Sequence, residues 1–61
     1  MTLYVLFQTD IHKTKTSRVF CGVFSQYSIA TANAIEQGIK VEETEIVECE
    51  LDEFEEFNTL L

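Results

Sequence analysis

Residues 18–39, RVFCGVFSQYSIATANAIEQGI, restrict the possible folds more than any other part of this 61-residue chain. Residues 18–24 are rich in β-branched and aromatic side chains, which is typical of a strand. Ser25 is predicted to be the N-cap of a helix over 26–37, because its hydroxyl can accept a hydrogen bond from a free backbone N–H. Gly38 is predicted to end that helix. The stretch therefore indicates a strand that turns directly into a helix.

Both predicted elements have two distinguishable faces. Strict alternation divides the strand between Val19, Cys21 and Val23 on one face and Phe20, Gly22 and Phe24 on the other. The glycine between two phenylalanines also predicts a bulge or a close approach of two backbones. At about 100° per residue, the helix face that packs on the sheet is expected to hold Tyr27, Ala30, Thr31, Ala34 and Ile35. Ile29 projects from nearly the opposite side, where it is a possible contact for a partner.

Two further strands flank this unit. The apolar run from Leu3 to Phe7 is continuous, which predicts a strand over 2–9 that is covered on both faces and central in its sheet. Residues 43–51 alternate, which indicates a half-buried strand with one solvated face. With the usual right-handed crossover, the chain is predicted to be one α+β domain over 1–61. Its ββαβ fold has a three-stranded antiparallel sheet of order 2-1-3, one packed helix and a short C-terminal helix.

The C-terminal segment, DEFEEFNTLL over 52–61, carries the last aromatic residues of the chain. Asp52 and Glu55 have the spacing of a capping box, and Phe54, Phe57 and Leu61 would lie on one side of a short helix. An isolated helix of this length is marginal in water. The segment is therefore expected either to cover the open face of its own sheet or to insert into a partner.

Charge is distributed unevenly along the chain. The formal net charge is −7, and ten of the 11 acidic residues lie from Glu36 onward. This balance argues against direct binding to nucleic acid, which needs a basic surface, and favours a partner with a basic or apolar surface. Carboxylates about 6–7 Å apart along a strand face would also resemble a phosphate backbone. An acidic nucleic-acid mimic that blocks a DNA- or RNA-binding enzyme is therefore one candidate.

No catalytic, metal-binding or cofactor-binding pattern is recognisable. His12 is the only histidine, and Asp10 is the only carboxylate near it in the sequence. Two cysteines and one histidine do not complete the four ligands of a structural zinc site, so Cys21 and Cys49 are predicted to be small buried residues with reduced thiols. Residues 1–10 have neither the basic region of a signal peptide nor a membrane span. A cytoplasmic, non-enzymatic protein is expected.

Three short segments resemble a group of small uncharacterised proteins from phages and bacteria. They are YVLF over Tyr4–Phe7, GVFS leading into the helix over Gly22–Ala30, and IVECELDE over Ile46–Glu53. The resemblance implies a ββαβ fold and no known activity. The helix of that group is commonly rich in Lys and Glu, whereas here it reads SIATANAIEQ. A helix surface with so little charge suits an interaction surface.

These observations lead to one functional expectation. The protein is expected to be a phage-type accessory protein that binds and inhibits a bacterial host protein, as anti-defence (anti-CRISPR-like) proteins do, in the host cytoplasm. The residues expected to bind the partner are Ile29, Glu48, Glu50, Glu53, Phe54, Glu56, Phe57, Leu60 and Leu61. The uncovered sheet face is expected to form a homodimer. A homodimeric structural or regulatory module is a further candidate, as is a small-ligand binder that uses the cations His12, Lys13, Lys15 and Arg18.

Overall fold

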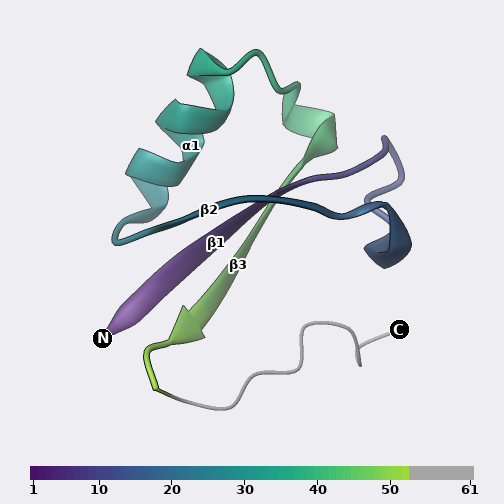
Figure 1. Cartoon of the computed structure of the whole chain (residues 1–61). Helices are drawn as coiled ribbons and strands as arrows, with labels where there is room; N and C mark the ends of the chain where they lie inside the picture. Colours follow the sequence, from purple (N-terminus) through teal and green to yellow (C-terminus); the bar gives the residue numbers. More distant parts are fainter. Residues whose placement is uncertain (53–61) are drawn as a thin grey trace.

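The computed structural model describes residues 1–52 and confirms the predicted α+β architecture (Figure 1). Its elements, in chain order, are β1 (Thr2–Gln8), the 3-10 turn η1 (Lys15–Ser17), β2 (Val19–Phe24), α1 (Tyr27–Glu36), the 3-10 turn η2 (Val41–Glu43) and β3 (Thr44–Glu50). The sheet has the predicted order β2-β1-β3, and both pairings are antiparallel. The helix predicted over 52–61 lies outside the described residues, apart from Asp52.

Strand β1 is the centre of the fold, as its continuous apolar run predicted. Val5, Leu6 and Phe7 are consecutive and all buried, so this strand is covered on both faces. Leu6 lies opposite Gly22 and Ile46 on the side of α1. Val5 and Phe7 point to the other side, as their alternation along the strand requires.

A β-bulge in β2 overturns the predicted division of its faces. Leu6 pairs with Gly22 and Phe7 pairs with Phe20, so Cys21 is an extra residue in β2. The extra residue resets the alternation, and Phe20 therefore lies on the same face as Val23. The bulge confirms one of the two alternatives predicted from Gly22, and a Cβ atom at Gly22 would lie 3.1 Å from the side-chain ring of Phe24.

Helix α1 ends as predicted but begins one residue later. Gln26, and not Ser25, occupies the N-cap position, and no side chain caps the helix there. At the other end, Gly38 has a φ of 80°, a conformation that suits glycine. The Gly38 N–H donates to the Ile35 carbonyl and the Ile39 N–H donates to the Ala34 carbonyl, both at 3.0 Å. These two bonds form a Schellman motif.

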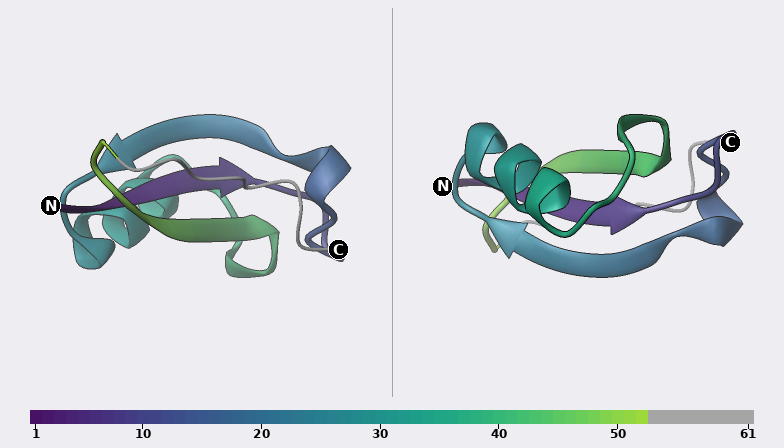
Figure 2. Two further views of the ribbon diagram at one scale, coloured as in Figure 1. Left: turned by 90° about the horizontal axis from the view of Figure 1, so that it is seen from below. Right: turned by 90° about the horizontal axis from the view of Figure 1, so that it is seen from above.

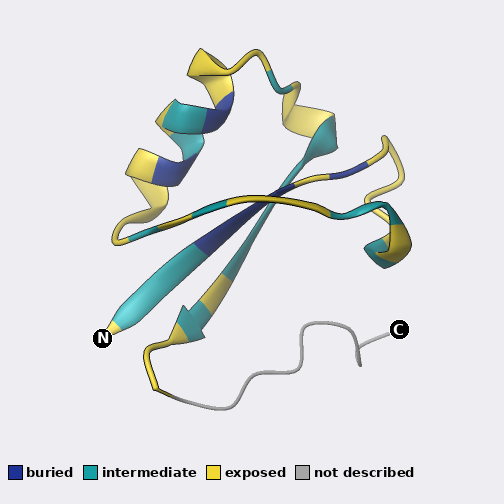
Figure 3. Cartoon of the chain, viewed as in Figure 1, coloured by how far each residue is buried: buried dark blue, intermediate teal, exposed yellow. Residues whose placement is uncertain are grey.

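The helix lies over one face of the sheet, and two alanines make its buried stripe (Figures 2 and 3). Ala30 and Ala34 are 0% and 2% exposed. Tyr27 and Ile35 were predicted to point inward with them, and this prediction was wrong because both side chains are exposed. The small alanine side chains let α1 approach the sheet, while the larger residues lie beside the contact.

The sheet face away from α1 is called the open face, because no helix within residues 1–52 lies on it. Its side chains are Leu3, Val5, Phe7, Phe20, Val23, Glu45, Val47 and Cys49. Phe20 and Val23 are exposed, as predicted for this face. At one end, Arg18 covers the ring of Phe7 at 5.0 Å and its Nε lies 2.6 Å from the Glu45 carboxylate.

Asp10 organises the loop between β1 and β2. Its carboxylate accepts three hydrogen bonds of 2.9–3.1 Å. Two come from the backbone N–H and the hydroxyl of Thr14, and one comes from the backbone N–H of His12. These bonds favour the ionised form and lower the pKa of Asp10. A carboxyl group whose pKa is lower in the folded state than in the unfolded state stabilises the protein at pH values above its unfolded-state pKa. That contribution is lost as the pH falls through the folded-state pKa.

Replacing Thr14 by valine is therefore expected to raise the pKa of Asp10 towards its ordinary value. The rise is expected to be partial, because the backbone N–H of residue 14 remains a donor. A carboxyl-carbon NMR titration measures the change. Thr16→Val in the same loop is the matched control, since Thr16 is exposed and makes no hydrogen bond to Asp10. Equal pKa values in wild type and Thr14→Val would contradict the assigned contact.

Candidate interaction surface

A shallow groove of about 340 Å³ runs between α1 and β3 on the helix side of the sheet. Tyr27 and Thr31 form its helix wall, and Val41, Thr44 and Ile46 form the opposite wall. Tyr27 stands edge-on to Tyr4, with 6.0 Å between ring centroids, and this contact fixes one end of the groove. The groove is open to solvent, and Lys13 and Glu45 also line it, so its walls are partly apolar and partly polar or charged.

Three large apolar side chains on and beside this groove are exposed. Val41 is 79% exposed, Ile35 is 71% exposed and Tyr27 is 59% exposed. Ile35 follows Thr31 by one helical turn, so it continues the wall that begins at Tyr27. We call Tyr27, Ile35 and Val41 the apolar ridge. Apolar groups that border a groove in this way are typical anchors for a protein partner.

Two carboxylates of β3 lie towards the Tyr27 end of the apolar ridge, because Tyr27 contacts Tyr4 and Tyr4 pairs with Glu48. Glu48 and Glu50 pair across the sheet with Tyr4 and Thr2, so they point to the same side as the groove. Both are exposed. The Thr2 hydroxyl donates to Glu50 at 2.5 Å, and this hydrogen bond is the main reason that the pKa of Glu50 is lowered. The ammonium group of Met1 also lies 3.5 Å from the Glu50 carboxylate and partly compensates its charge.

The three predicted partner-binding residues within the described part of the chain do not form one surface. Glu48 and Glu50 lie on the β3 side of α1, whereas Ile29 lies on the β2 side, above Asn33 on the helix. Ile29 is 40% exposed, as predicted, but the helix separates it from the two carboxylates. The remaining predicted residues lie outside the described part of the chain: Glu53, Phe54, Glu56, Phe57, Leu60 and Leu61.

A second hollow, of about 440 Å³, lies between α1 and β2. Its lining is mostly neutral and polar, with Cys21, Asn33 and Gln37 around the apolar Leu6 and Phe24. Cys21 and Cys49 are both free thiols, but the prediction that both are buried was wrong. Cys21 is exposed because the bulge places it at the β2 edge, and Cys49 is half-buried on the open face.

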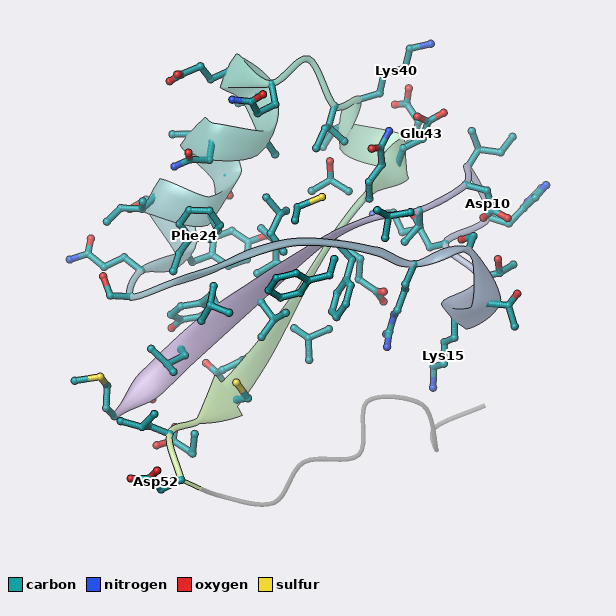
Figure 4. The ribbon with its side chains drawn as sticks, in the orientation of Figure 1. Asp10, Lys15, Phe24, Lys40, Glu43 and Asp52 are labelled. Carbon is teal, nitrogen blue, oxygen red and sulfur yellow. The ribbon has the colours of Figure 1, made fainter. Side chains whose placement is uncertain are left out.

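The cations of the β1–β2 loop are not gathered into one binding site. Lys13 Nζ donates to the Thr44 carbonyl at 2.8 Å, whereas Arg18 pairs with Glu45 on the open face. His12 contributes its backbone N–H to Asp10. Lys15 points away from α1 (Figure 4). These directions do not favour a small-ligand site in this loop.

Within residues 1–52, no group of three or more His, Cys, Asp or Glu side chains could hold a metal ion. Over the same residues, no helix has the length and apolar character needed to cross a membrane.

Comparison of the chain with protein families, with curated proteins and with solved structures finds no match. A proposed function therefore depends on the surface itself and on the resemblance of the three short segments.

Sequence reasoning missed the apolar ridge. Tyr27 and Ile35 were predicted to be buried, and Val41 was not among the predicted binding residues. The composition of the helix could have indicated that some of its apolar side chains are exposed. Its buried stripe needs only Ala30 and Ala34, so larger apolar residues elsewhere on the helix were available for another contact.

Proposed function

We propose that this protein is a non-enzymatic accessory protein of the phage type that binds and inhibits a bacterial protein in the host cytoplasm. The observation that carries the proposal is the exposed apolar ridge of Tyr27, Ile35 and Val41, with the carboxylates Glu48 and Glu50 towards its Tyr27 end. The resemblance to small phage and bacterial proteins supplies the biological setting. An anti-defence role is the specific form of the proposal.

The chemistry of this surface defines the partner. Exposed Tyr and branched aliphatic side chains fill apolar pockets and exclude water from nearby polar contacts. Carboxylates at the rim steer a basic surface to the correct position, and this effect weakens as salt increases. The partner is therefore a protein whose surface has an apolar pocket flanked by Lys or Arg. Inhibition follows where that surface is needed for the partner's own activity.

Replacing Val41 or Ile35 by lysine is expected to weaken binding by about 30-fold each, because loss of an anchor contact costs about 2 kcal/mol. Val19→Lys is the matched control, since Val19 is 59% exposed on the opposite edge strand. The bacterial target is the protein retained by wild type and by Val19→Lys but lost by Val41→Lys. Titrating purified wild-type protein into that target should then lower its activity.

Two results would contradict the proposal. One is a target that binds Val41→Lys and Ile35→Lys as tightly as wild type. The other is a target that binds through the ridge but keeps its full activity when saturated. Circular dichroism of each variant checks that the fold is retained, which is expected because both side chains are largely in solvent.

The nucleic-acid mimic remains a second candidate because Glu48 and Glu50 alternate on one strand face, about 6–7 Å apart. It makes a different prediction. Glu48→Gln and Glu50→Gln would then weaken binding at least as much as the ridge variants, and nucleic acid would compete for the target. Binding that does not change with salt concentration would exclude this candidate.

A further inference from the structure

Strand β2 is one edge of the sheet, and within residues 1–52 no strand lies on its outer side (Figure 2). An edge strand presents backbone N–H and C=O groups that can pair with another extended chain, and charged side chains usually protect it. The opposite edge strand, β3, has the exposed carboxylates Glu48 and Glu50. By contrast, no residue of Val19–Phe24 is charged. The β2 edge is therefore the one that remains suited to pairing with another strand.

Exposed apolar side chains border this edge on both sides of the sheet. Phe20 is 63% exposed and Val23 is 50% exposed, and both lie on the open face. On the other side, Val19 is exposed beside Gln8, and Ile29 is exposed on the flank of α1 that is nearer β2. An added strand sends alternate side chains to both faces of a sheet. Edge-to-edge pairing would therefore cover all of these apolar groups at once.

The hollow of about 440 Å³ between α1 and β2 lies beside the same edge. Cys21 and Phe24 of β2 line one side of it, and Asn33 and Gln37 of α1 line the other. Where a strand is added to a sheet edge, pockets of this kind accept its alternate side chains and provide specificity. The lining of this hollow has no charged side chain. The strand that fits here therefore has neutral side chains.

A second copy of the chain provides such a strand, because its own β2 is extended and uncharged. The net charge of −7 on each chain opposes association in general. Pairing through β2 reduces this repulsion, because the order β2-β1-β3 then places the two acidic β3 strands at opposite ends of the joined sheet. They would be five strand spacings apart, or about 24 Å, which is about three Debye lengths at physiological salt.

We propose that two copies of this protein pair antiparallel through their β2 edges and form one continuous six-stranded sheet. A twofold axis perpendicular to the sheet relates the copies, so both α1 helices lie on the same side of it. A pair of six-residue strands is about 20 Å long, and its contact area falls below about 1,200 Å². A dimer that dissociates in the micromolar range is therefore expected. The apolar ridge, on the β3 side of α1, stays accessible in this dimer, so the proposal is independent of the proposed function.

Sedimentation velocity and NMR of the full-length protein test this proposal directly. Between about 10 μM and about 1 mM, the sedimenting mass is expected to rise from 7.0 kDa towards twice that value. Over the same range, backbone amide shifts are expected to change at Val19–Phe24 and at Ile29, but not at Thr44–Glu50. A mass that stays at 7.0 kDa throughout overturns the proposal. A dimer whose amide shifts change at Thr44–Glu50 and not at Val19–Phe24 also overturns it.

A matched pair of variants gives a second test. Val19→Glu is expected to raise the dissociation constant of the dimer at least about tenfold, because a symmetric contact contains each substitution twice and charge at an edge opposes pairing. Val41→Glu is the control, since it adds the same charge to an exposed residue away from the β2 edge, and its dissociation constant should stay within about twofold of wild type. Equal dissociation constants for Val19→Glu and wild type would contradict the proposal. If circular dichroism shows that Val19→Glu is unfolded, the amide shifts of the wild type decide.

Discussion

Replacing Ala30 by leucine is expected to remove a third or more of the stability of this protein. Ala30 is fully buried, at 0% exposure, on the stripe of α1 that faces the sheet. Extra methylene groups in a closely packed contact typically cost 1–3 kcal/mol, and here about 3 kcal/mol is expected, because a leucine would separate helix and sheet. A 61-residue domain has roughly 3–9 kcal/mol in total. The variant is therefore expected to unfold at a much lower urea concentration than the wild type.

Urea unfolding followed by far-ultraviolet circular dichroism measures this effect. Ala32→Leu is the matched control, because Ala32 is in the same helix but exposed. Its unfolding free energy is expected to change by less than about 0.5 kcal/mol, as is usual for surface substitutions. If Ala32→Leu were as destabilising as Ala30→Leu, α1 would have to pack on the sheet through a different face.

The parts of the fold that could be predicted from the sequence depend on patterns within one element. The unbroken run Leu3–Phe7 indicated a strand buried on both sides, and β1 is central. Gly38 indicated the end of the helix, and it has the positive φ that the Schellman motif needs. The order of elements and the usual crossover then left few topologies. These features depend on local composition, so sequence alone was sufficient for them.

The parts that were predicted incorrectly depend on contacts between elements. Cys21 is an extra residue only in relation to the register of β1, and one such residue changes the face of every side chain on one side of it. The direction of Tyr27 and Ile35 similarly depends on where the helix axis lies above the sheet. Helical periodicity predicted a stripe that was too wide, because only Ala30 and Ala34 are buried on the helix.

The candidate interaction surface shows the same difference between features of one element, which were predicted, and contacts between elements, which were not. The acidic residues of the third strand were identified from alternation, and the register places Glu48 and Glu50 together on the α1 side. Ile29 was correctly predicted to be exposed, yet it lies across the helix from those carboxylates. The position of Val41 at the groove follows only from the packing of η2 beside α1. A surface made from separate elements cannot be assembled from sequence until the packing of those elements is known.

Replacing Arg18 by methionine is the second change with a large expected effect, of about 2 kcal/mol. The Arg18 side chain is 9% exposed and its Nε lies 2.6 Å from a Glu45 carboxylate oxygen. Hydrogen bonds to charged groups contribute about 1.5–3 kcal/mol. Methionine retains most of the cover over the Phe7 ring but leaves Glu45, which is 26% exposed, without this partner. The loss is expected in the free energy of unfolding in urea.

A double-mutant cycle separates the ion pair from the packing. Glu45→Met alone is expected to be at least as harmful, because it leaves the more buried guanidinium uncompensated. The variant with both substitutions should recover much of the loss, since two apolar side chains can replace a buried ion pair. If the single effects simply add, Arg18 acts by covering Phe7 and the pair contributes little. Recovery of stability in the double variant would show that Arg18, the only arginine of this chain, stabilises the fold and does not serve to bind an anionic ligand.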